Sequence, residues 1–171
     1  MWNKRSNFRE NNYYHIYNRW FEKQIIFRDD YDFIRFYKYV IKNQKEYIDE
    51  IKVVSYCFLP NHFHFVFKIN ETGLLLSDFM RKIQVSYAMY FKRKYTDNET
   101  IFNRPVFEWR FKSKLINSEE YLNKCLAYVN FNALKHDIVE DINDYKWTSY
   151  HQIDNKKIEK YKYLELNELE L

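Results

Sequence analysis

The feature that most constrains this chain is an alternation of phenylalanines with two histidines directly after a Pro-Asn pair. Residues 59–67 read Leu-Pro-Asn-His-Phe-His-Phe-Val-Phe, which places His62 and His64 two positions apart. A period of two puts the phenylalanines on one face of a half-buried strand and both imidazoles on the other. Neighbouring neutral imidazoles are ready ligands for a divalent metal. A bare His-x-His is a weak motif, however, and two histidines on a polar sheet face are the alternative interpretation.

The segments around this strand predict a small sheet with helices between its strands. Apolar and β-forming residues predict strands at 13–19, 51–58, 63–69 and 106–116, and helices at about 30–45, 75–94 and 119–134. Up to the last helix, this order matches a ferredoxin-like split βαβ sandwich of the α+β class, with an antiparallel sheet. We expect the helices of that unit to lie on one face. The other face would then be open to a ligand, with both histidines directed toward the last long helix.

The length and composition of the chain predict one domain. At 171 residues we place the core at about 13–150 and a C-terminal tail, with the look of a docking helix or strand, at 151–171. Cys57 and Cys125 have apolar neighbours and are expected to be buried, reduced thiols. The chain shows no apolar signal core and no apolar run of membrane length, so we expect a cytoplasmic protein without a membrane partner.

Charge and aromatic content give a weak indication of nucleic-acid binding. A net charge of +4 is too small to indicate it alone, but aromatics at 21% interleaved with lysines suit stacking on unpaired bases. Arg110, Lys112 and Lys114 alternate along the fourth predicted strand, and cations on one strand face suit phosphates. Lys92 and Arg93 end the preceding helix, where they are candidate DNA contacts or simply a solvated helix end that suits the helix dipole.

A set of ordered motifs resembles the single-tyrosine HUH transposases, in particular their REP-associated tyrosine transposase branch. The motifs are Tyr14-His-Ile-Tyr-Asn-Arg19 with Ile26-Phe-Arg-Asp29, then Tyr56-Cys-Phe-Leu-Pro-Asn-His-Phe-His64, the Ser86-Tyr87 helix, Arg110-Phe-Lys-Ser113, and finally Tyr128-Val-Asn-Phe-Asn132 with Tyr145-Lys-Trp-Thr-Ser-Tyr150. Each motif alone is weak, but their order and spacing across most of the chain make the combination specific.

The resemblance implies a catalytic site and a reaction. It assigns the metal-binding pair to His62 and His64, the nucleophile to Tyr128 and a third metal ligand to Asn132. The implied activity is metal-dependent nicking and joining of single-stranded, hairpin-containing DNA through a 5′-phosphotyrosine intermediate, by a monomer or a homodimer. Residues four apart share a helix face, so the Asn132 oxygen can reach a metal at the phosphate that Tyr128 attacks. Two imidazoles and an amide oxygen suit Mg²⁺ or Mn²⁺.

The chain also departs from the family pattern at two places. The common Asn-Pro-Val-Arg-Ala-Gly is Asn132-Ala-Leu-Lys-His-Asp137 here, and the common Asn-Arg-Gly is Asn18-Arg19-Trp20. Neither change touches a predicted catalytic group. Both fall in segments expected to read DNA, where Arg19 is a candidate contact, so the recognised DNA sequence is not predicted.

Two other classes of function are compatible with the same residues. A non-catalytic single-stranded nucleic-acid-binding module would stack bases on aromatics of a four-stranded sheet, but the glycines of such motifs are absent and histidines occupy the opposite face. A water-using metal phosphodiesterase of the two-histidine type would need a second His-x-Thr/Ser element, which the sequence lacks. Covalent trapping on DNA in the presence of metal separates all three.

Overall fold

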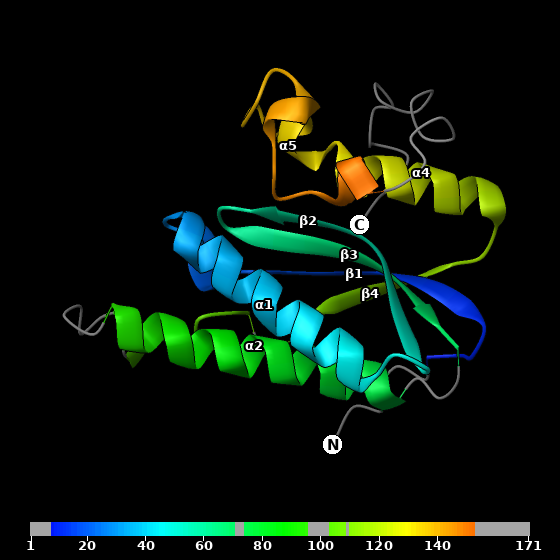
Figure 1. Cartoon of the computed structure of the whole chain (residues 1–171), viewed down its shortest axis with the longest axis horizontal. Helices are drawn as coiled ribbons and strands as arrows, with labels where there is room; N and C mark the ends of the chain where they lie inside the picture. Colours follow the sequence, from blue (N-terminus) through cyan, green and yellow to red (C-terminus); the bar gives the residue numbers. More distant parts are fainter. Residues whose placement is uncertain (1–7, 71–73, 96–102, 109, 153–171) are drawn as a thin grey trace.

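The fold is built on a four-stranded antiparallel sheet in the order β2-β3-β1-β4 (Figure 1). The computed structural model describes residues 8–70, 74–95, 103–108 and 110–152. Its strands are β1 (Asn12–Arg19), β2 (Ile51–Leu59), β3 (His62–Ile69) and β4 (Lys112–Ile116). With a helix after β1 and another after β3, this is the ferredoxin-like arrangement expected from the sequence.

The two helices of the split βαβ unit lie on one face of this sheet, as expected, but the last long helix covers the other face, which was expected to be open. The longer helices are α1 (Asp30–Glu46), α2 (Leu74–Lys94) and α4 (Glu119–Asn130), and the short ones are α5 (Asn132–Lys135), η1 (Phe21–Lys23), η2 (Ile142–Asp144) and η3 (Ser149–Gln152). Figure 1 shows α1 and α2 on one side of the sheet, the α1–α2 face, and α4 on the other, the α4 face. The histidine face is therefore covered by a helix of the same chain.

The helix starts follow from capping residues that the sequence makes visible. The Asp29 side chain accepts a hydrogen bond from the Asp32 amide at 3.0 Å, and α1 begins at the next residue. The Ser118 side chain does the same for the Tyr121 amide at 3.1 Å at the start of α4. Each cap satisfies an amide that would otherwise have no partner in the first turn.

The alternation on β3 divides the hydrophobic side chains between two cores. Phe63, Phe65 and Phe67 are fully buried on the α1–α2 face, where Phe36 of α1 and Tyr87 of α2 belong to the same cluster. The intervening Val66 belongs to a second cluster beneath α4, with Cys57, Cys125 and Val129 among its members. Both cysteines are buried free thiols, as expected.

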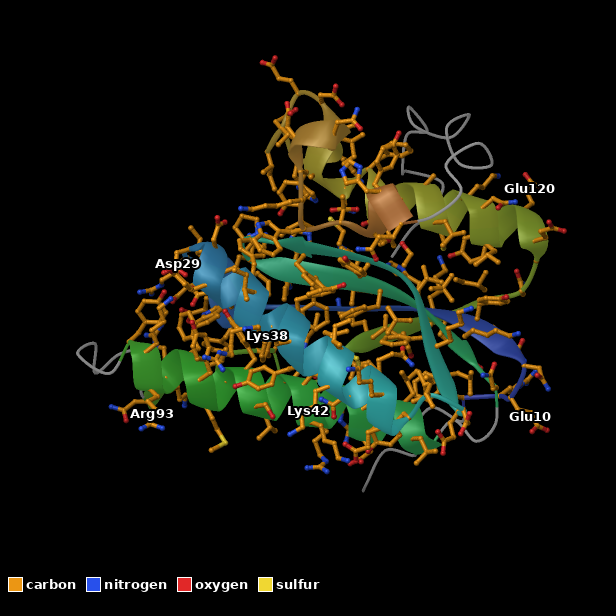
Figure 2. The ribbon with its side chains drawn as sticks, in the orientation of Figure 1. Glu10, Asp29, Lys38, Lys42, Arg93 and Glu120 are labelled. Atoms are coloured by element: carbon orange, nitrogen blue, oxygen red, sulfur yellow. The ribbon has the colours of Figure 1, made fainter. Side chains whose placement is uncertain are left out.

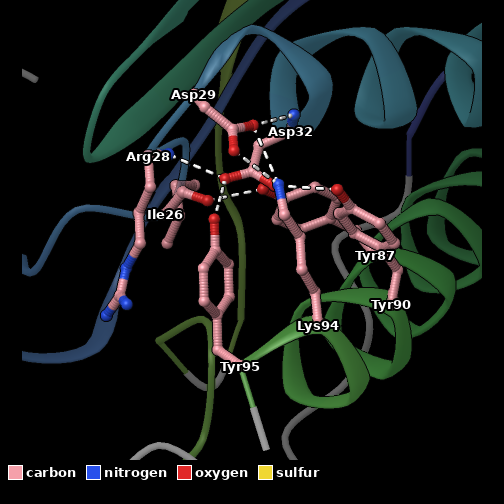
Figure 3. A network of polar contacts seen from close by, with 8 residues as sticks. All are labelled: Ile26, Arg28, Asp29, Asp32, Tyr87, Tyr90, Lys94 and Tyr95. Carbon is pink, nitrogen blue, oxygen red and sulfur yellow. Dashed lines mark hydrogen bonds and ion pairs between the residues drawn. The ribbon is translucent and has the colours of Figure 1, made fainter.

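A buried carboxylate ties α1 to α2 on the α1–α2 face (Figure 3). The side chain of Asp32 is 0% exposed and accepts hydrogen bonds from the Tyr90 and Tyr95 hydroxyls, the Lys94 ammonium and the Arg28 amide, each at 2.8 Å. Burial raises the pKa of Asp32, but the donated hydrogen bonds outweigh burial and lower it overall. The carboxylate therefore stays ionised inside the fold.

The segment after α5 returns to the sheet, as its aromatic composition predicted. The Phe58 amide donates to the Trp147 carbonyl at 2.9 Å, and the Tyr56 amide donates to the Ser149 hydroxyl at 2.9 Å. The Tyr145 hydroxyl donates to the Phe58 carbonyl at 2.5 Å. These bonds hold residues 145–150 against β2. The predicted tail lies almost entirely outside the described residues, which end at Gln152.

The fourth strand is shorter than the sequence predicted. Only Lys112–Ile116 pairs with β1 as a strand, whereas Phe107 forms an isolated bridge with Trp20. Val106 and Phe107 are buried in the core of the α1–α2 face. Because Phe107 packs into that core rather than extending the ladder, the predicted continuous strand at 106–116 is wrong in its first half. Trp109 and most of the predicted loop at 95–105 lie outside the described residues.

The last predicted helix is also interrupted. It runs from Glu119 to Asn130, and the backbone of Phe131 (φ −90°, ψ 9°) separates it from α5. The ring of Phe131 is buried and packs on Tyr150, with centroids 5.4 Å apart. This contact with a later segment is not visible in a helical pattern.

Among the described helices, none is long and apolar enough to cross a membrane.

Candidate active site

His62 and His64 lie at the start of β3, a central strand, and face α4 as the alternation predicted. Their ring centroids are 5.1 Å apart and the ring planes are 85° apart. His64 is 3% exposed, whereas His62 is half-buried at the strand end. The Asn61 side-chain oxygen lies 2.6 Å from His62 Nδ1. An amide oxygen can only accept, so this bond places the His62 proton on Nδ1 and leaves a lone pair on Nε2.

Helices α4 and α5 bring Tyr128 and Asn132 over the histidine pair. The Tyr128 ring meets His64 edge-on, with centroids 5.3 Å apart and planes 87° apart. The Asn132 side chain is fully buried, and its Nδ2 donates to the Tyr128 carbonyl at 3.4 Å. The structure therefore brings together all four residues for which a catalytic or metal-binding role was predicted.

A third buried histidine belongs to this site and was not predicted from the sequence. His15 on β1 is fully buried, and its Nε2 lies 3.0 Å from Nδ1 of His64. Tyr17, two residues further along β1, stacks on His64 with centroids 5.6 Å apart. The available signal was the alternation of tyrosine and histidine at 13–17, which becomes informative once β1 is known to lie beside β3.

Two further side chains come from the segment in which the chain departs from the family pattern. The His136 ring meets the His62 ring with centroids 5.1 Å apart. The Lys135 ammonium lies 5.2 Å from the centroid of the Tyr128 ring. The end of α5 therefore adds a cation and an imidazole to the site.

The donor set of the site fits a divalent metal through two imidazoles and one amide. The side-chain oxygen of Asn132 is buried and has no partner with hydrogen-bond geometry, although its amide is close enough to His62 and Tyr128 to affect the pKa of both. The described residues contain no group of three or more His, Cys, Asp and Glu side chains able to hold a metal. A metal held here would therefore need the Asn132 oxygen as its third protein donor.

Burial keeps the imidazoles in the neutral form that a metal requires. It lowers the pKa of His15 to about 3, with the Lys114 charge adding to the effect. It lowers the pKa of His62 to about 4, with a further contribution from His136, and it holds the pKa of His64 well below the usual range. Burial raises the pKa of Tyr128, which the Asn132 amide partly opposes, so the phenol is protonated at neutral pH.

Three of the predicted cationic contacts lie around this site. Lys112 and Lys114 of β4 pair with Tyr17 and His15 of β1, and the Lys112 ammonium lies 5.8 Å from the Tyr17 ring centroid. Arg19 pairs in register with His62 at the strand end and forms a 2.5 Å ion pair with Glu108. All three cations therefore lie on β1 or β4, the two strands on one side of the histidine pair on β3.

The remaining predicted cations lie elsewhere, which corrects the expectation of three cations on one strand face. Arg110 precedes β4 and lines a groove beside α2 together with Arg81 and Val85. Lys92 and Arg93 belong to the last turn of α2. Figure 2 shows Arg93 at the end of α2, on the side of the sheet away from α4. The separation arises because the chain before Lys112 leaves the sheet and packs into the α1–α2 core.

Three comparisons with known proteins each find similarity to transposases. The sequence profile of IS200-like transposases matches residues 8–132. A Haemophilus influenzae protein, provisionally named a REP-associated tyrosine transposase, is 24% identical over 129 residues, which cover 71% of this chain and 70% of that protein. A solved REP-associated tyrosine transposase bound to a REP hairpin superposes with a TM-score of 0.68 at 15% identity, over 89% of this chain and 84% of that one. The superposition confirms the predicted α+β fold.

Proposed function

This chain belongs to the IS200-like transposase family, and on that premise we propose that it nicks and joins single-stranded DNA with Tyr128 as the nucleophile. The family match bears out the resemblance drawn from the sequence motifs. The observation that carries the proposal is the position of Tyr128, whose ring packs edge-on against His64 beside the unpartnered oxygen of Asn132. A nucleophile next to a set of metal donors is an arrangement suited to phosphoryl transfer to a side chain.

The proposed step is an in-line displacement at phosphorus. Tyr128 Oη forms a bond to phosphorus, the bond from phosphorus to the 3′ oxygen breaks, and the phenolic proton passes to water. The departing 3′ oxygen takes up a proton, which leaves a free 3′-hydroxyl and a 5′-phosphotyrosine. A 3′-hydroxyl from a second strand can reverse the step and join two strands, because the energy of the phosphodiester is kept in the phosphotyrosine.

His62, His64 and Asn132 would hold the divalent metal, Mg²⁺ or Mn²⁺, with the two imidazoles favouring Mn²⁺. When bound, the metal would polarise the scissile phosphate. This assistance matters because burial raises the pKa of Tyr128, so the protein surroundings alone do not produce a phenolate. The Lys135 ammonium lies 5.2 Å from the Tyr128 ring centroid. From there it could contact the phosphate that Tyr128 attacks.

The proposed substrate is a DNA hairpin with a flanking single strand. Two comparisons support it, the name of the Haemophilus influenzae relative and the REP hairpin bound in the structural neighbour. The positions of Lys112, Lys114 and Arg19 around the histidines support a phosphate track on the α4 face. Phosphate contacts of this kind position a strand without reading its sequence.

The first test is covalent trapping on a hairpin oligonucleotide with single-stranded flanks in the presence of Mn²⁺. We expect the wild-type protein to form an adduct that peptide mass spectrometry maps to Tyr128, and a free 3′-hydroxyl fragment to appear. Tyr128→Phe should lose the adduct completely, because one oxygen is removed while the ring keeps its packing. Tyr121→Phe makes the same change earlier in α4 and should leave the adduct at the wild-type level.

Each other outcome identifies a different function. An adduct mapped to another tyrosine keeps the class of enzyme and moves the nucleophile. Cleavage by Tyr128→Phe without an adduct means that water is the nucleophile, as in a metal phosphodiesterase. Hairpin binding by the wild-type protein without metal-dependent cleavage means that the protein is a binding module.

A further inference from the structure

The contact between His15 and His64 has the geometry of an in-plane hydrogen bond. The two nitrogens are 3.0 Å apart, the ring centroids are 5.2 Å apart and the planes differ by 15°. Rings stacked face to face would have closer centroids, so these rings meet edge to edge in a common plane. Both side chains are buried, which excludes bulk water as a competing partner.

The direction of this hydrogen bond decides whether His64 can bind a metal. A neutral imidazole has one N–H and one lone pair. If His64 Nδ1 donates to His15 Nε2, then His64 Nε2 keeps its lone pair and can ligate. If His15 Nε2 donates instead, the proton of His64 lies on Nε2 and blocks ligation.

Nothing else in the described structure sets the proton position of His15. Its Nδ1 is buried and has no hydrogen-bond partner, so the ring is free to carry its proton there and accept through Nε2. His62 has the corresponding arrangement with Asn61, which also engages Nδ1 and leaves Nε2 for a ligand. The two histidines of the motif would therefore present the same nitrogen.

We propose that His15 is a positioning residue that accepts the His64 Nδ1 proton and thereby presents His64 Nε2 to the metal. This inference rests on the metal site of the proposed function. It assigns no chemical step to His15, because the residue acts only through His64. Partners of this kind fix the tautomer and orientation of a ligating histidine, and their loss commonly weakens metal affinity by about 10–100-fold.

The first measurement is the affinity of the full chain for Mn²⁺ alone, by titration calorimetry or electron paramagnetic resonance. His15→Phe keeps a ring but removes the acceptor, and we expect its affinity to fall by about 10–100-fold. His15→Gln offers a side-chain oxygen at a similar reach and should regain most of the affinity. His151→Phe makes the same change at an exposed histidine of η3 and should bind Mn²⁺ as the wild-type protein does.

The second measurement is the tautomer of His64 in metal-free protein, read from nitrogen-15 shifts of labelled histidines. The wild-type protein and His15→Gln should carry the proton on Nδ1, and His15→Phe should shift it toward Nε2. The backbone amide spectrum of each variant shows whether the fold survives. A residue with a purely structural role would change stability without moving this proton.

Two results would overturn the inference, and one would overturn only its premise. A wild-type His64 protonated on Nε2, or a His15→Phe variant with unchanged Mn²⁺ affinity, removes the positioning role. If the wild-type protein binds no Mn²⁺, the proposed metal site fails, while the metal-free tautomer still decides the direction of the bond between His15 and His64.

Discussion

A buried polar site lies on each face of the sheet, and the two sites differ in how far their polar atoms are paired. On the α1–α2 face, both oxygens of Asp32 are fully used by hydrogen bonds from four donor groups (Figure 3). On the α4 face lie His15 Nδ1, Tyr121 Oη and Asn132 Oδ1, the three buried side-chain atoms without a hydrogen-bond partner among the described residues. An unpartnered buried polar group costs about 1–3 kcal/mol of stability. The site on the α4 face leaves the Asn132 oxygen available to a ligand, whereas the site on the α1–α2 face uses its polar atoms to hold two helices together.

The largest expected effect is on the α4 face. His62→Ala should abolish metal-dependent cleavage, because it removes one of the two proposed imidazole ligands, and the half-buried position should tolerate the truncation. His64→Ala should abolish cleavage too, but the 3% exposed ring leaves a cavity, so this variant should also lose stability. Adduct formation, Mn²⁺ titration and urea unfolding separate the two effects. Full nicking activity in either variant would show that these histidines hold no catalytic metal.

The α1–α2 face should respond through stability alone. Asp32→Asn removes the charge that Lys94 and the two tyrosines surround, and breaking such a buried pair costs about 3–5 kcal/mol. Asp30→Asn is a matched change in the same helix turn, where the 2.6 Å ion pair with Lys146 is exposed and should contribute less than about 1 kcal/mol. Urea unfolding gives both values. The two faces would not differ as proposed if both variants lost the same free energy of unfolding. The same holds if Asp32→Asn folded but formed no covalent adduct with DNA.

The faces should also lose stability in different ranges of pH. The pKa of His15 is about 3 and that of His62 about 4 in the fold, against about 6.5 in the unfolded chain. The unfolded chain therefore binds more protons below pH 6.5, so this stability is complete above that pH and is lost as the pH falls toward 4. The slope is up to about 1.4 kcal/mol per pH unit for each histidine.

Asp32 provides the comparison, because its pKa is lowered from 3.8 and its contribution is lost only below that pH. Urea unfolding with EDTA between pH 7 and 4 measures the histidine part, and His15→Gln should flatten the slope. An unchanged slope in that variant would mean that His15 does not titrate differently in the folded and unfolded chain.

The smallest effect concerns salt dependence of DNA binding. Neutralising Lys112 and Lys114 together should reduce the slope of log affinity against log salt by up to about 1.4, at roughly 0.7 per single-strand contact. Neutralising Arg110 and Arg93 should leave the slope near the wild-type value, because neither lies on the α4 face. Binding of a fluorescent hairpin at several salt concentrations gives the slopes. If neutralising Arg110 and Arg93 changed the slope more, the phosphate contacts would lie on the α2 side of the sheet instead.

Local patterns in the sequence were sufficient for most of the helices and strands, and for the direction in which the predicted site residues point. A period of two directs His62 and His64 to one face of β3. A spacing of four brings Tyr128 and Asn132 together, even though Phe131 interrupts the predicted helix between them. The caps at Asp29 and Ser118 act within one turn and were visible for the same reason. Each of these predictions concerns the direction of a side chain relative to its own element, which nearest neighbours in the chain determine.

Tertiary structure alone decided which elements meet. His15 joins the site because β1 pairs beside β3, and Arg110 leaves it because Phe107 packs into the α1–α2 core. Phe131 ends α4 where it contacts Tyr150, a partner from a later segment. These outcomes depend on contacts between residues far apart in the sequence. The periodicity of apolar residues shows which way a side chain points, but it does not identify the residue that the side chain will contact. The sequence by itself therefore determined that His62 and His64 face the last helix, and only the packed sheet determined that His15 lies beside His64.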